Sequence, residues 1–269
     1  SLGGCGNVLR NLINLGVNAS VVSIVGKDQA GRKIIEDLTK KGFSTDGLLQ
    51  SKSIRTTEKM RIIAEGQQLA RVDWDVNNLT DQSLDQVLQQ ISKIQNSVDA
   101  VIISDYNKGL CKEFILKDVI SKAKELQIPV FVDPKGDKWD KYRGATIITP
   151  NLKEAEEAIG RELINDEDVE TAGKEICEDL SLSGCLITRG PNGMSYISQD
   201  LKLHVCSEAK EIYDVSGAGD TVIASFAAGI SAGFDSEAAT RFANKAAGIV
   251  VGHIGTTAIT ISELKEYGN

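Results

Sequence analysis

Short apolar runs alternate along this chain with amphipathic stretches of helical spacing. Strands are predicted at residues 20–25, 100–104, 130–133 and 146–149, and helices at 30–41 and 113–126. The runs VII at 101–103 and VFV at 130–132 lack the in/out alternation of a half-exposed strand, which is typical of parallel strands covered on both faces. We therefore predict an α/β fold with a doubly wound, mostly parallel sheet flanked by helices.

One segment, at about residues 54–75, departs from this rhythm. Residues 57–75 read TEKMRIIAEGQQLARVDWD, two alternating runs joined at Gly66, and this pattern predicts an antiparallel hairpin. The alternation gathers apolar side chains on one face and charged ones, among them Arg61 and Arg71, on the other. Two interpretations stay open: a lid that presents these arginines to a ligand, or an edge hairpin with solvated charges.

The second half of the chain is rich in strands and then in helices. Strands are predicted at 185–188, 194–198 and 202–205, followed by helices at 220–232 and 236–251. The two helices are rich in Ala, Gly and Ser, so they can approach a neighbouring backbone or a flat ligand closely. Because no linker divides the chain, we expect a single domain over residues 1–269.

Composition and charge exclude several function classes. Thirty Lys and Arg against 38 Asp and Glu leave a net charge of −8, without the basic excess of a nucleic-acid binder. No apolar stretch approaches the roughly 20 residues needed to span a bilayer, and no secretion signal opens the chain, so we expect a cytoplasmic protein. Five scattered cysteines and two histidines indicate neither a disulfide framework nor a zinc site.

The densest chemical signal is DVSGAGDT at residues 214–221. Gly217, Ala218 and Gly219 leave backbone N–H groups bare at the positive end of a helix, which is an anion site. Asp220 stands at the mouth of that site, where it either caps the helix or acts as a base. With a phosphoryl group in the site, Asp220 would take the proton from an attacking hydroxyl while the N–H groups hold the developing charge.

Other nucleotide-binding motifs are missing from the sequence. It contains no GxxxxGK[ST], no HRD and no DFG, and GCGNVL at residues 4–9 fails GxGxxG at its last position. Walker NTPases, protein kinases and dinucleotide-dependent dehydrogenases are therefore disfavoured.

Four motifs together resemble the ribokinase-like, or PfkB-type, carbohydrate kinases. They are GGCGN at 3–7, NLKE at 151–154, TRGPNGM at 188–194 and DVSGAGDT at 214–221. Their order and spacing fit that family from residue 3 to about residue 256. The resemblance implies a ribokinase-like fold with a hairpin lid, and an ATP-dependent sugar kinase.

The resemblance also implies roles for individual residues. Asp220 would be the catalytic base, and Gly217, Ala218 and Gly219 the anion hole. Sugar hydroxyls would be contacted by Gly3, Gly4 and Asn7.

The cofactors implied by the resemblance are ATP, Mg²⁺ and, in members that use one, a monovalent cation. Asn151 and Glu154 would hold Mg²⁺ through water and phosphate, although their spacing also fits an N-cap and a first-turn carboxylate. The cation would lie near Asp214 and residues 252–256. The residues on the ATP side would be Asn151, Glu154, Thr188, Gly190, Gly193, Asp214, Asn244 and Gly248.

Within the family, further motifs resemble the subgroup that phosphorylates D-glycero-β-D-manno-heptose 7-phosphate at C1, towards ADP-heptose. They are SDYNKG at 104–109, VDPKG at 132–136, YRGAT at 142–146 and the hairpin. Ser104 and Asp133 end two predicted parallel strands, so Lys108 and Lys135 fall in loops at the carboxyl edge of the sheet, where α/β proteins bind ligands. With Arg61 and Arg71 these lysines would neutralise a sugar phosphate; the alternative is that they are solvated loop lysines. Asp133 is a further candidate for binding the substrate.

Three further expectations follow from the resemblance. The partners are a sugar phosphate and ATP, with a homodimer formed through the hairpin. Relatives carry an upstream strand, so we expect the native protein to extend beyond Ser1, and related bifunctional enzymes add a nucleotidyltransferase domain. The competing hypotheses are a kinase for another sugar, such as fructose phosphate, ribose or a keto-deoxy acid, and a non-catalytic nucleotide-binding relative.

Overall fold

The computed structural model describes residues 2–64, 67–74 and 79–267. The chain forms two compact units. Unit 1 comprises Ser1–Ala19, Gln95–Tyr106 and Leu116–Asn269, and unit 2 comprises Ser20–Ile94 and Asn107–Ile115. The single domain over residues 1–269 stays a prediction.

Unit 1 is built on a six-stranded sheet with the strand order β10-β9-β8-β7-β6-β5. The strands are β5 (Val101–Ser104), β6 (Val130–Asp133), β7 (Ile147–Ile148), β8 (Gly184–Thr188), β9 (Met194–Ile197) and β10 (Lys202–Val205). Strands β5 to β8 are parallel, whereas β8, β9 and β10 pair antiparallel. The predicted mostly parallel α/β sheet is thus confirmed.

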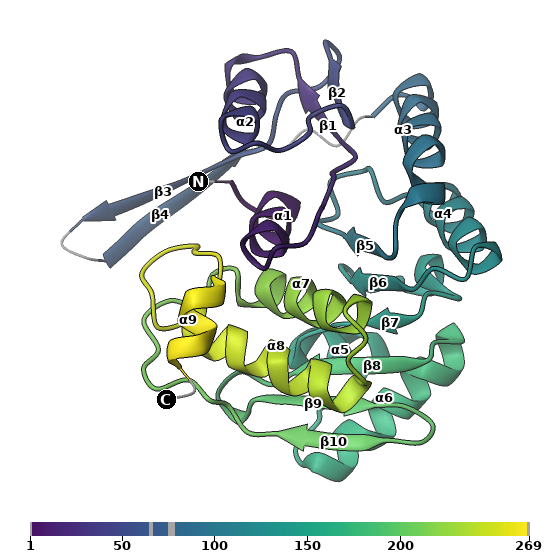
Figure 1. Ribbon diagram of the computed structural model, residues 1–269, viewed down its shortest axis with the longest axis vertical. Coiled ribbons are helices and arrows are strands. Elements are labelled where there is room, and N and C mark those ends of the chain that lie inside the picture. The colour runs from purple at the N-terminus through teal and green to yellow at the C-terminus, as the bar shows by residue number, and fades with distance from the viewer. Residues whose placement is uncertain (1, 65–66, 75–78, 268–269) are drawn as a thin grey trace. The chain divides into compact units, whose positions relative to one another are not determined.

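Helices cover both faces of this sheet. Figure 1 shows α7 (Ala218–Ser231) and α8 (Ser236–Val250) in front of the strands and α6 (Asp166–Leu180) behind them. The other helices that lie wholly in unit 1 are α1 (Cys5–Asn14), α5 (Leu152–Ile159) and α9 (Ile261–Glu266). Unit 1 also contains the short 3-10 helices η1 (Gln95–Ser97), η2 (Asp140–Tyr142) and η3 (Gly190–Asn192). Helix α4 (Glu113–Glu125) belongs to unit 1 from Leu116 onward. Two neighbours on β9 illustrate the layering, because successive strand residues point to opposite faces. Tyr196 stacks on Phe226 of α7, and Ile197 packs against Gly173 of α6.

Aromatic side chains fill the layer between the sheet and α7. Phe226 is fully buried, and its ring centroid lies 5.9 Å from that of Phe131 on β6, edge to face, and 5.9 Å from that of Tyr196. Such aromatic contacts stabilise a core beyond the area they bury. They fix α7, and with it the turn at residues 214–219, over the centre of the sheet.

We expect Gly173→Ala to destabilise the protein, although Gly to Ala inside a helix ordinarily stabilises by about 1 kcal/mol. A Cβ at Gly173 would lie 2.7 Å from both Cβ and Cγ1 of Ile197. These atoms lie at the branch point of a fully buried side chain, so the helix must move away from the sheet, at a cost of about 1–3 kcal/mol. Urea unfolding measures the change, and an equal or higher midpoint would contradict this packing.

Unit 2 contains a two-stranded parallel sheet and the hairpin. Strand β1 (Ser23–Gly26) pairs with β2 (Leu48–Ser51), with α2 (Gln29–Lys40) between them and α3 (Asp81–Ile94) after the hairpin. The strand predicted at 20–25 therefore starts at Ser23 and pairs within unit 2.

The predicted antiparallel hairpin is present as β3 (Glu58–Ala64) and β4 (Gln67–Trp74). Met60 pairs with Val72 and Ile62 with Ala70, which confirms the apolar face expected from the alternation. The turn at residues 65–66 and the side chains of Arg61 and Arg71 lie outside the described residues.

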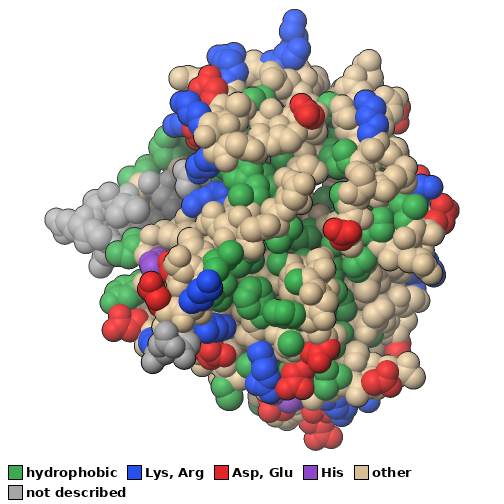
Figure 2. All heavy atoms as spheres, in the orientation of Figure 1, with side chains coloured by type: hydrophobic (Ala, Val, Ile, Leu, Met, Phe, Trp, Pro, Cys, Tyr) green, Lys and Arg blue, Asp and Glu red, His purple; other side chains and the backbone are tan. Residues whose placement is uncertain are grey.

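Within the described ranges, no helix is long and apolar enough to cross a membrane. On the face drawn in Figure 2, basic and acidic side chains are interspersed over the region of α8, β9 and β10. This distribution agrees with the modest net charge of −8.

Candidate active site

The turn before α7 carries the motif DVSGAGDT. Gly217 is the N-cap of α7, with a left-handed φ of 86°, and among the described residues no side chain caps this helix end. A Cβ added at Gly219 would meet no described atom within 4 Å, so the space in front of the turn is open. The Ala218 amide donates to the Val215 carbonyl oxygen (3.2 Å). An open, positively polarised helix end of this kind favours an anion, and the anion-hole role of these residues stays a prediction.

Asp220 lies in the first turn of α7, and it is 7% exposed. Asn7 Nδ2 donates a hydrogen bond to its Oδ2 (3.0 Å), and the hydroxyl of Tyr106 donates to its Oδ1. Asn7 belongs to α1, which packs beside α7 (Figure 1), and Tyr106 follows β5. The carboxylate is therefore bound by two other segments, and the helix-cap interpretation is wrong.

Two glycines of the sequence motifs make room for these partners. A Cβ at Gly217 would lie 2.7 Å from Asn7 Nδ2, and a Cβ at Gly4 would lie 3.0 Å from the Tyr106 ring. Gly4 also has a positive φ of 56°, which favours glycine. The glycines of both predicted motifs thus let Asn7 and Tyr106 reach Asp220.

The protonation of these groups follows from their surroundings. Burial raises the pKa of Asp220 above its ordinary value, while the hydrogen bonds from Tyr106 and Asn7 oppose that rise. Burial and the neighbouring charge of Asp220 raise the pKa of Tyr106 well above its usual range. Tyr106 therefore stays protonated and acts as the donor of this hydrogen bond.

Asp133 ends β6 beside this carboxylate. Burial, followed by the charges of Asp220 and Glu154, raises the pKa of Asp133 to about 8. Like charges that share a poorly solvated site cannot all ionise at neutral pH, so Asp133 holds a proton there.

This shift predicts that Asp133→Asn stabilises the protein more at pH 8 than at pH 5. The ordinary pKa of an aspartate is 3.8, and that of Asp133 in the folded protein is about 8. At pH values between these two, Asp133 has lost its proton in the unfolded chain and keeps it in the folded protein, so the stability of the wild type falls as pH rises. The side chain is partly exposed, so we expect a difference on the order of 2 kcal/mol between the two pH values. Urea unfolding of both proteins checks this. Parallel pH dependences for the two proteins would contradict it.

Lys135, Asn151 and Glu154 come together at the start of α5. Lys135 Nζ lies 2.7 Å from Glu154 Oε1. The backbone N–H of Asn151 donates to Glu154 Oε2 (3.0 Å), and the backbone N–H of Glu154 donates to Asn151 Oδ1 (2.9 Å). The capping interpretation of NLKE is therefore right, and the Mg²⁺ role stays a prediction beside it.

The loop that carries Lys135 is anchored from behind. The Lys135 N–H donates to Tyr142 Oη (3.1 Å), and Tyr142 Oη donates to Asp105 Oδ2 (2.7 Å). Asp105 is 3% exposed and also pairs with Lys141 at 2.6 Å. This buried, charge-assisted network holds the backbone of Lys135 in place.

The segment TRGPNGM forms a tight turn between β8 and β9. Thr188 bridges to Asn151, which places the two predicted ATP-side residues next to each other. Gly190 and Gly193 have positive φ angles of 57° and 80°, and a Cβ at Gly193 would overlap the Val205 carbonyl oxygen. Only glycine fits this position.

The remaining residues predicted on the ATP side hold loops in position. Asn244 Nδ2 donates to the Cys206 carbonyl oxygen (2.8 Å), and a Cβ at Gly248 would lie 3.0 Å from the backbone N of Ala209. Asp214 accepts hydrogen bonds from the N–H groups of Ser216 (2.8 Å) and Gly255 (3.1 Å). Their contacts with nucleotide or cation stay predictions.

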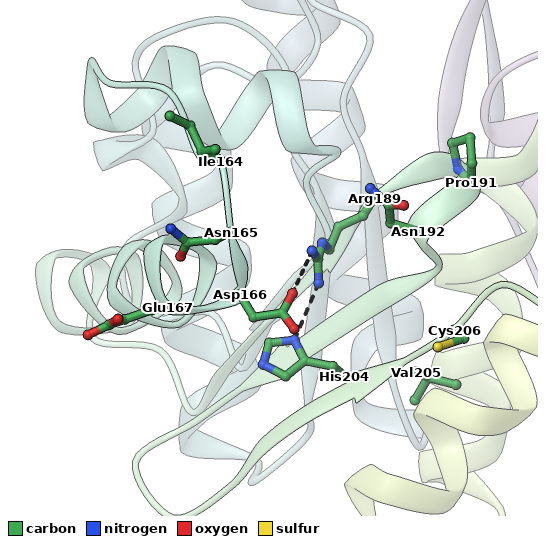
Figure 3. Close-up of a pocket in the computed structure, with 10 residues that line it drawn as sticks. All are labelled: Ile164, Asn165, Asp166, Glu167, Arg189, Pro191, Asn192, His204, Val205 and Cys206. Atoms are coloured by element: carbon green, nitrogen blue, oxygen red, sulfur yellow. Dashed lines mark hydrogen bonds and ion pairs between the residues drawn. The ribbon is translucent and has the colours of Figure 1, made fainter.

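A pocket of about 780 Å³ lies beside this turn, between the start of α6, η3 and β10. In Figure 3 the Arg189 side chain points toward Asp166 and His204, whose side chains lie close together. Its guanidinium pairs with Asp166 Oδ1 at 2.6 Å and donates to Ser195 Oγ at 3.0 Å. The pocket was not predicted from the sequence, and neither Asp220 nor Lys135 lines it.

Residues 1–263 match the family described as pfkB family carbohydrate kinase. The chain belongs to this family. The match confirms the family predicted from the motifs.

Solved structures share the fold of this pfkB family kinase. Escherichia coli phosphofructokinase-2 in complex with potassium has a TM-score of 0.83 and 21% identity, over 98% of this chain and 86% of that one. Arabidopsis thaliana ribokinase complexed with ribose and ATP has a TM-score of 0.80 and 20% identity, over 97% and 85%. At these identities the likeness shows a ribokinase-like fold.

Curated relatives are more similar in sequence. The bifunctional protein HldE of Wolinella succinogenes is 40% identical over 268 residues, 99% of this chain and 56% of that protein. The protein of the same name from Nitratiruptor sp. is 39% identical, over 99% of this chain and 56% of that protein. The chain therefore spans about half the length of the curated relatives it matches.

The pfkB kinases use ATP, generally with Mg²⁺, and the oxygen donors of Asn151 and Glu154 are of the kind that Mg²⁺ prefers. Within the ranges that the structure describes, no group of three His, Cys, Asp or Glu side chains could hold a metal. Mg²⁺ in kinases is ordinarily bound through one or two protein oxygens together with phosphates and water, so these two residues fit it.

Sequence reasoning assigned no role to Tyr106, Asp105 or Tyr142, although the first two stand within the quoted motif SDYNKG. The sequence feature that could have drawn attention to them is that Asp105 and Tyr106 directly follow a buried strand. Conversely, Lys108, Arg61 and Arg71 belong to unit 2, and their meeting with Lys135 stays a prediction. A Cβ added at Gly3 would meet no described atom within 4 Å, so the contact of Gly3 with sugar hydroxyls stays a prediction.

Proposed function

We propose that this carbohydrate kinase transfers the γ-phosphate of ATP to the C1 hydroxyl of D-glycero-β-D-manno-heptose 7-phosphate, towards ADP-heptose. The observation that carries the proposal is a buried carboxylate, Asp220, oriented by two hydrogen bonds at the open N-terminus of α7. The choice of sugar is supported by the subgroup motifs and by 39–40% identity to proteins named HldE.

In the proposed reaction Asp220 accepts the proton of the anomeric hydroxyl as its oxygen attacks the γ-phosphorus in line. One O–P bond forms, the bond from the γ-phosphorus to the β-phosphate oxygen breaks, and ADP leaves. The positive end of α7 stabilises the charge on the transferred group. Gly3, Gly4 and Asn7 face the sugar.

Asn151 and Glu154 are proposed to hold Mg²⁺, which when bound neutralises charge on the phosphates. Lys135 is proposed to bind the 7-phosphate, because it follows the carboxyl end of β6 and its ammonium group lies half-exposed beside Glu154. Lys108, Arg61 and Arg71 are proposed to bind the same phosphate. Asp133, neutral at pH 7, donates or accepts a hydrogen bond with a sugar hydroxyl.

The nucleotide is proposed to lie along Thr188, Gly190, Gly193, Asn244 and Gly248, with its adenine end near Asp214 and residues 252–256. A monovalent cation is proposed near Asp214, whose side chain joins the loops before α7 and after α8. A potassium complex of E. coli phosphofructokinase-2, which shares the fold, supports testing K⁺ against Na⁺.

A coupled ADP-release assay with Mg²⁺-ATP tests the function. It compares D-glycero-D-manno-heptose 7-phosphate with fructose 6-phosphate, fructose 1-phosphate and ribose. A strong kcat/KM preference for the heptose phosphate supports the proposal. Preferred turnover of another sugar would refute the substrate, and no turnover with any sugar would favour a non-catalytic protein.

We also propose that two copies associate through the hairpin. Its apolar face is exposed, with Met60 52% and Ile62 45% accessible, and such a face is stabilised by a partner. Light scattering is expected to give a dimer that Ile62→Lys weakens. Lys59→Gln, on the opposite face, is the control. A monomeric wild-type protein would refute this association.

A further inference from the structure

Both oxygens of the Asp220 carboxylate are engaged. Asn7 donates to Oδ2 at 3.0 Å, and the Tyr106 hydroxyl donates to Oδ1. Asn7 is fully buried on α1, and Tyr106 is half-buried after β5. Two segments distant in sequence thus fix the orientation of one carboxylate.

The Tyr106 ring packs against a glycine. Its edge lies against Gly4, where a Cβ would be 3.0 Å away, so the ring depends on a glycine at that position. Tyr106 follows Asp105, which is buried and paired with Lys141. One edge of the phenol is therefore packed on Gly4, and the residue before it in the chain is anchored by a buried ion pair.

We propose that Tyr106 is a positioning residue for phosphoryl transfer, which holds the Asp220 carboxylate in its proton-accepting form and orientation together with Asn7. The inference rests on the proposed role of Asp220 as the base. A carboxylate oxygen has more than one lone pair, so Oδ1 and Oδ2 each keep acceptor capacity for the substrate hydroxyl. The two donors select the ionised form because a hydrogen bond to a carboxylate stabilises its charge.

Among the described residues, Asp133 and Tyr106 are titratable groups whose pKa responds to the charge of Asp220. From β6, Asp133 lies close enough for its pKa to be raised by the charge of Asp220. From the segment after β5, Tyr106 stays protonated, and Asn7 on α1 does not titrate. Removing the Tyr106 hydroxyl therefore takes away a donor that opposes the effect of burial on Asp220.

The test compares Tyr106→Phe with Tyr196→Phe. The first keeps the ring on Gly4 and removes only the hydroxyl. The second removes the hydroxyl of another buried tyrosine of unit 1, whose oxygen accepts a hydrogen bond from Ser236 Oγ (3.2 Å) away from Asp220. The kcat and kcat/KM of each protein are measured against pH, with whichever sugar the wild type phosphorylates.

For Tyr106→Phe we expect kcat to fall about 10- to 100-fold, the value of one hydrogen bond to a charged group, with KM nearly unchanged. The acid limb of the kcat/KM profile is expected to move to higher pH, because activity requires ionised Asp220. Tyr196→Phe is expected to keep the wild-type profile. An acid limb of Tyr106→Phe that coincides with that of the wild type would overturn the proposal, whatever happens to kcat.

A measurement without substrate separates this inference from the proposed function. With ¹³Cγ-labelled aspartate, NMR follows the titration of the Asp220 carboxyl, assigned by its loss in Asp220→Asn. A midpoint at higher pH in Tyr106→Phe than in the wild type is expected. If the heptose phosphate is not a substrate but the titration midpoint of Asp220 moves, only the substrate assignment fails. If the midpoint does not move, the role of Tyr106 is rejected and the proposed function is unaffected.

Discussion

Replacing Asp220 with Asn is expected to lower kcat by at least about 10³-fold, the range of a lost general base. The amide is nearly isosteric with the carboxylate, so Tyr106 can still donate to its oxygen and the fold is retained. It cannot accept the proton of the attacking hydroxyl. The loss therefore falls on the chemical step rather than on binding.

Coupled ADP release measures kcat, and calorimetry measures ATP affinity. The affinity is expected to stay within about twofold, because Asp220 is proposed to face the attacking hydroxyl rather than the nucleotide. Asp235→Asn is the matched control. Asp235 caps α8 by accepting from the Ala238 N–H at 2.8 Å, and Asn is an equally good cap. Near-normal turnover by the Asp220→Asn protein would show that Asp220 is not the catalytic base.

Lys135→Ala is expected to raise KM for a phosphorylated sugar by about 10- to 100-fold, which corresponds to one lost charge-assisted hydrogen bond to phosphate. Lys135 now pairs with Glu154 at 2.7 Å, and its side chain is 51% exposed, so it is free to turn to a ligand. The effect on kcat is expected to be smaller, because the 7-phosphate is remote from the reacting C1 hydroxyl.

Two comparisons make this prediction specific. With a heptose that lacks the 7-phosphate, KM is expected to be equal for wild type and Lys135→Ala. Lys153→Ala removes an exposed lysine of α5 that pairs with Glu157 at 3.7 Å. This variant is expected to leave KM unchanged both for the phosphorylated sugar and for the heptose without the 7-phosphate. An unchanged KM of Lys135→Ala for the phosphorylated sugar would place the phosphate elsewhere.

Most of the sheet was predictable from local pattern. Strand β6 occupies the predicted residues 130–133, and β10 the predicted 202–205. Runs of β-branched residues bounded by turn residues determine such strands locally. The partner of β1 was not predictable, since pairing depends on which elements meet after the chain folds, and here β1 pairs with β2 in unit 2.

The candidate site was predictable in part. The glycines and the aspartate of DVSGAGDT, and the capping box of NLKE, are local features that the sequence displays. Tyr106 was missed because nothing within SDYNKG shows what its hydroxyl contacts. The ion pair of Lys135 with Glu154 was likewise missed, because it joins the ends of two different segments.

By itself, the sequence determined the six strands of the unit 1 sheet, the hairpin, and helices α7 and α8. These elements follow from propensity and periodicity, which are local properties. The motifs resembled the family, and the match over residues 1–263 confirmed it. The tertiary structure alone decided what Asp220 contacts: Asn7 lies 213 residues away in the chain and Tyr106 lies 114 away. Contacts at such separation arise from the packing of α1 on α7 and from the place of β5 in the sheet, which local interactions do not specify.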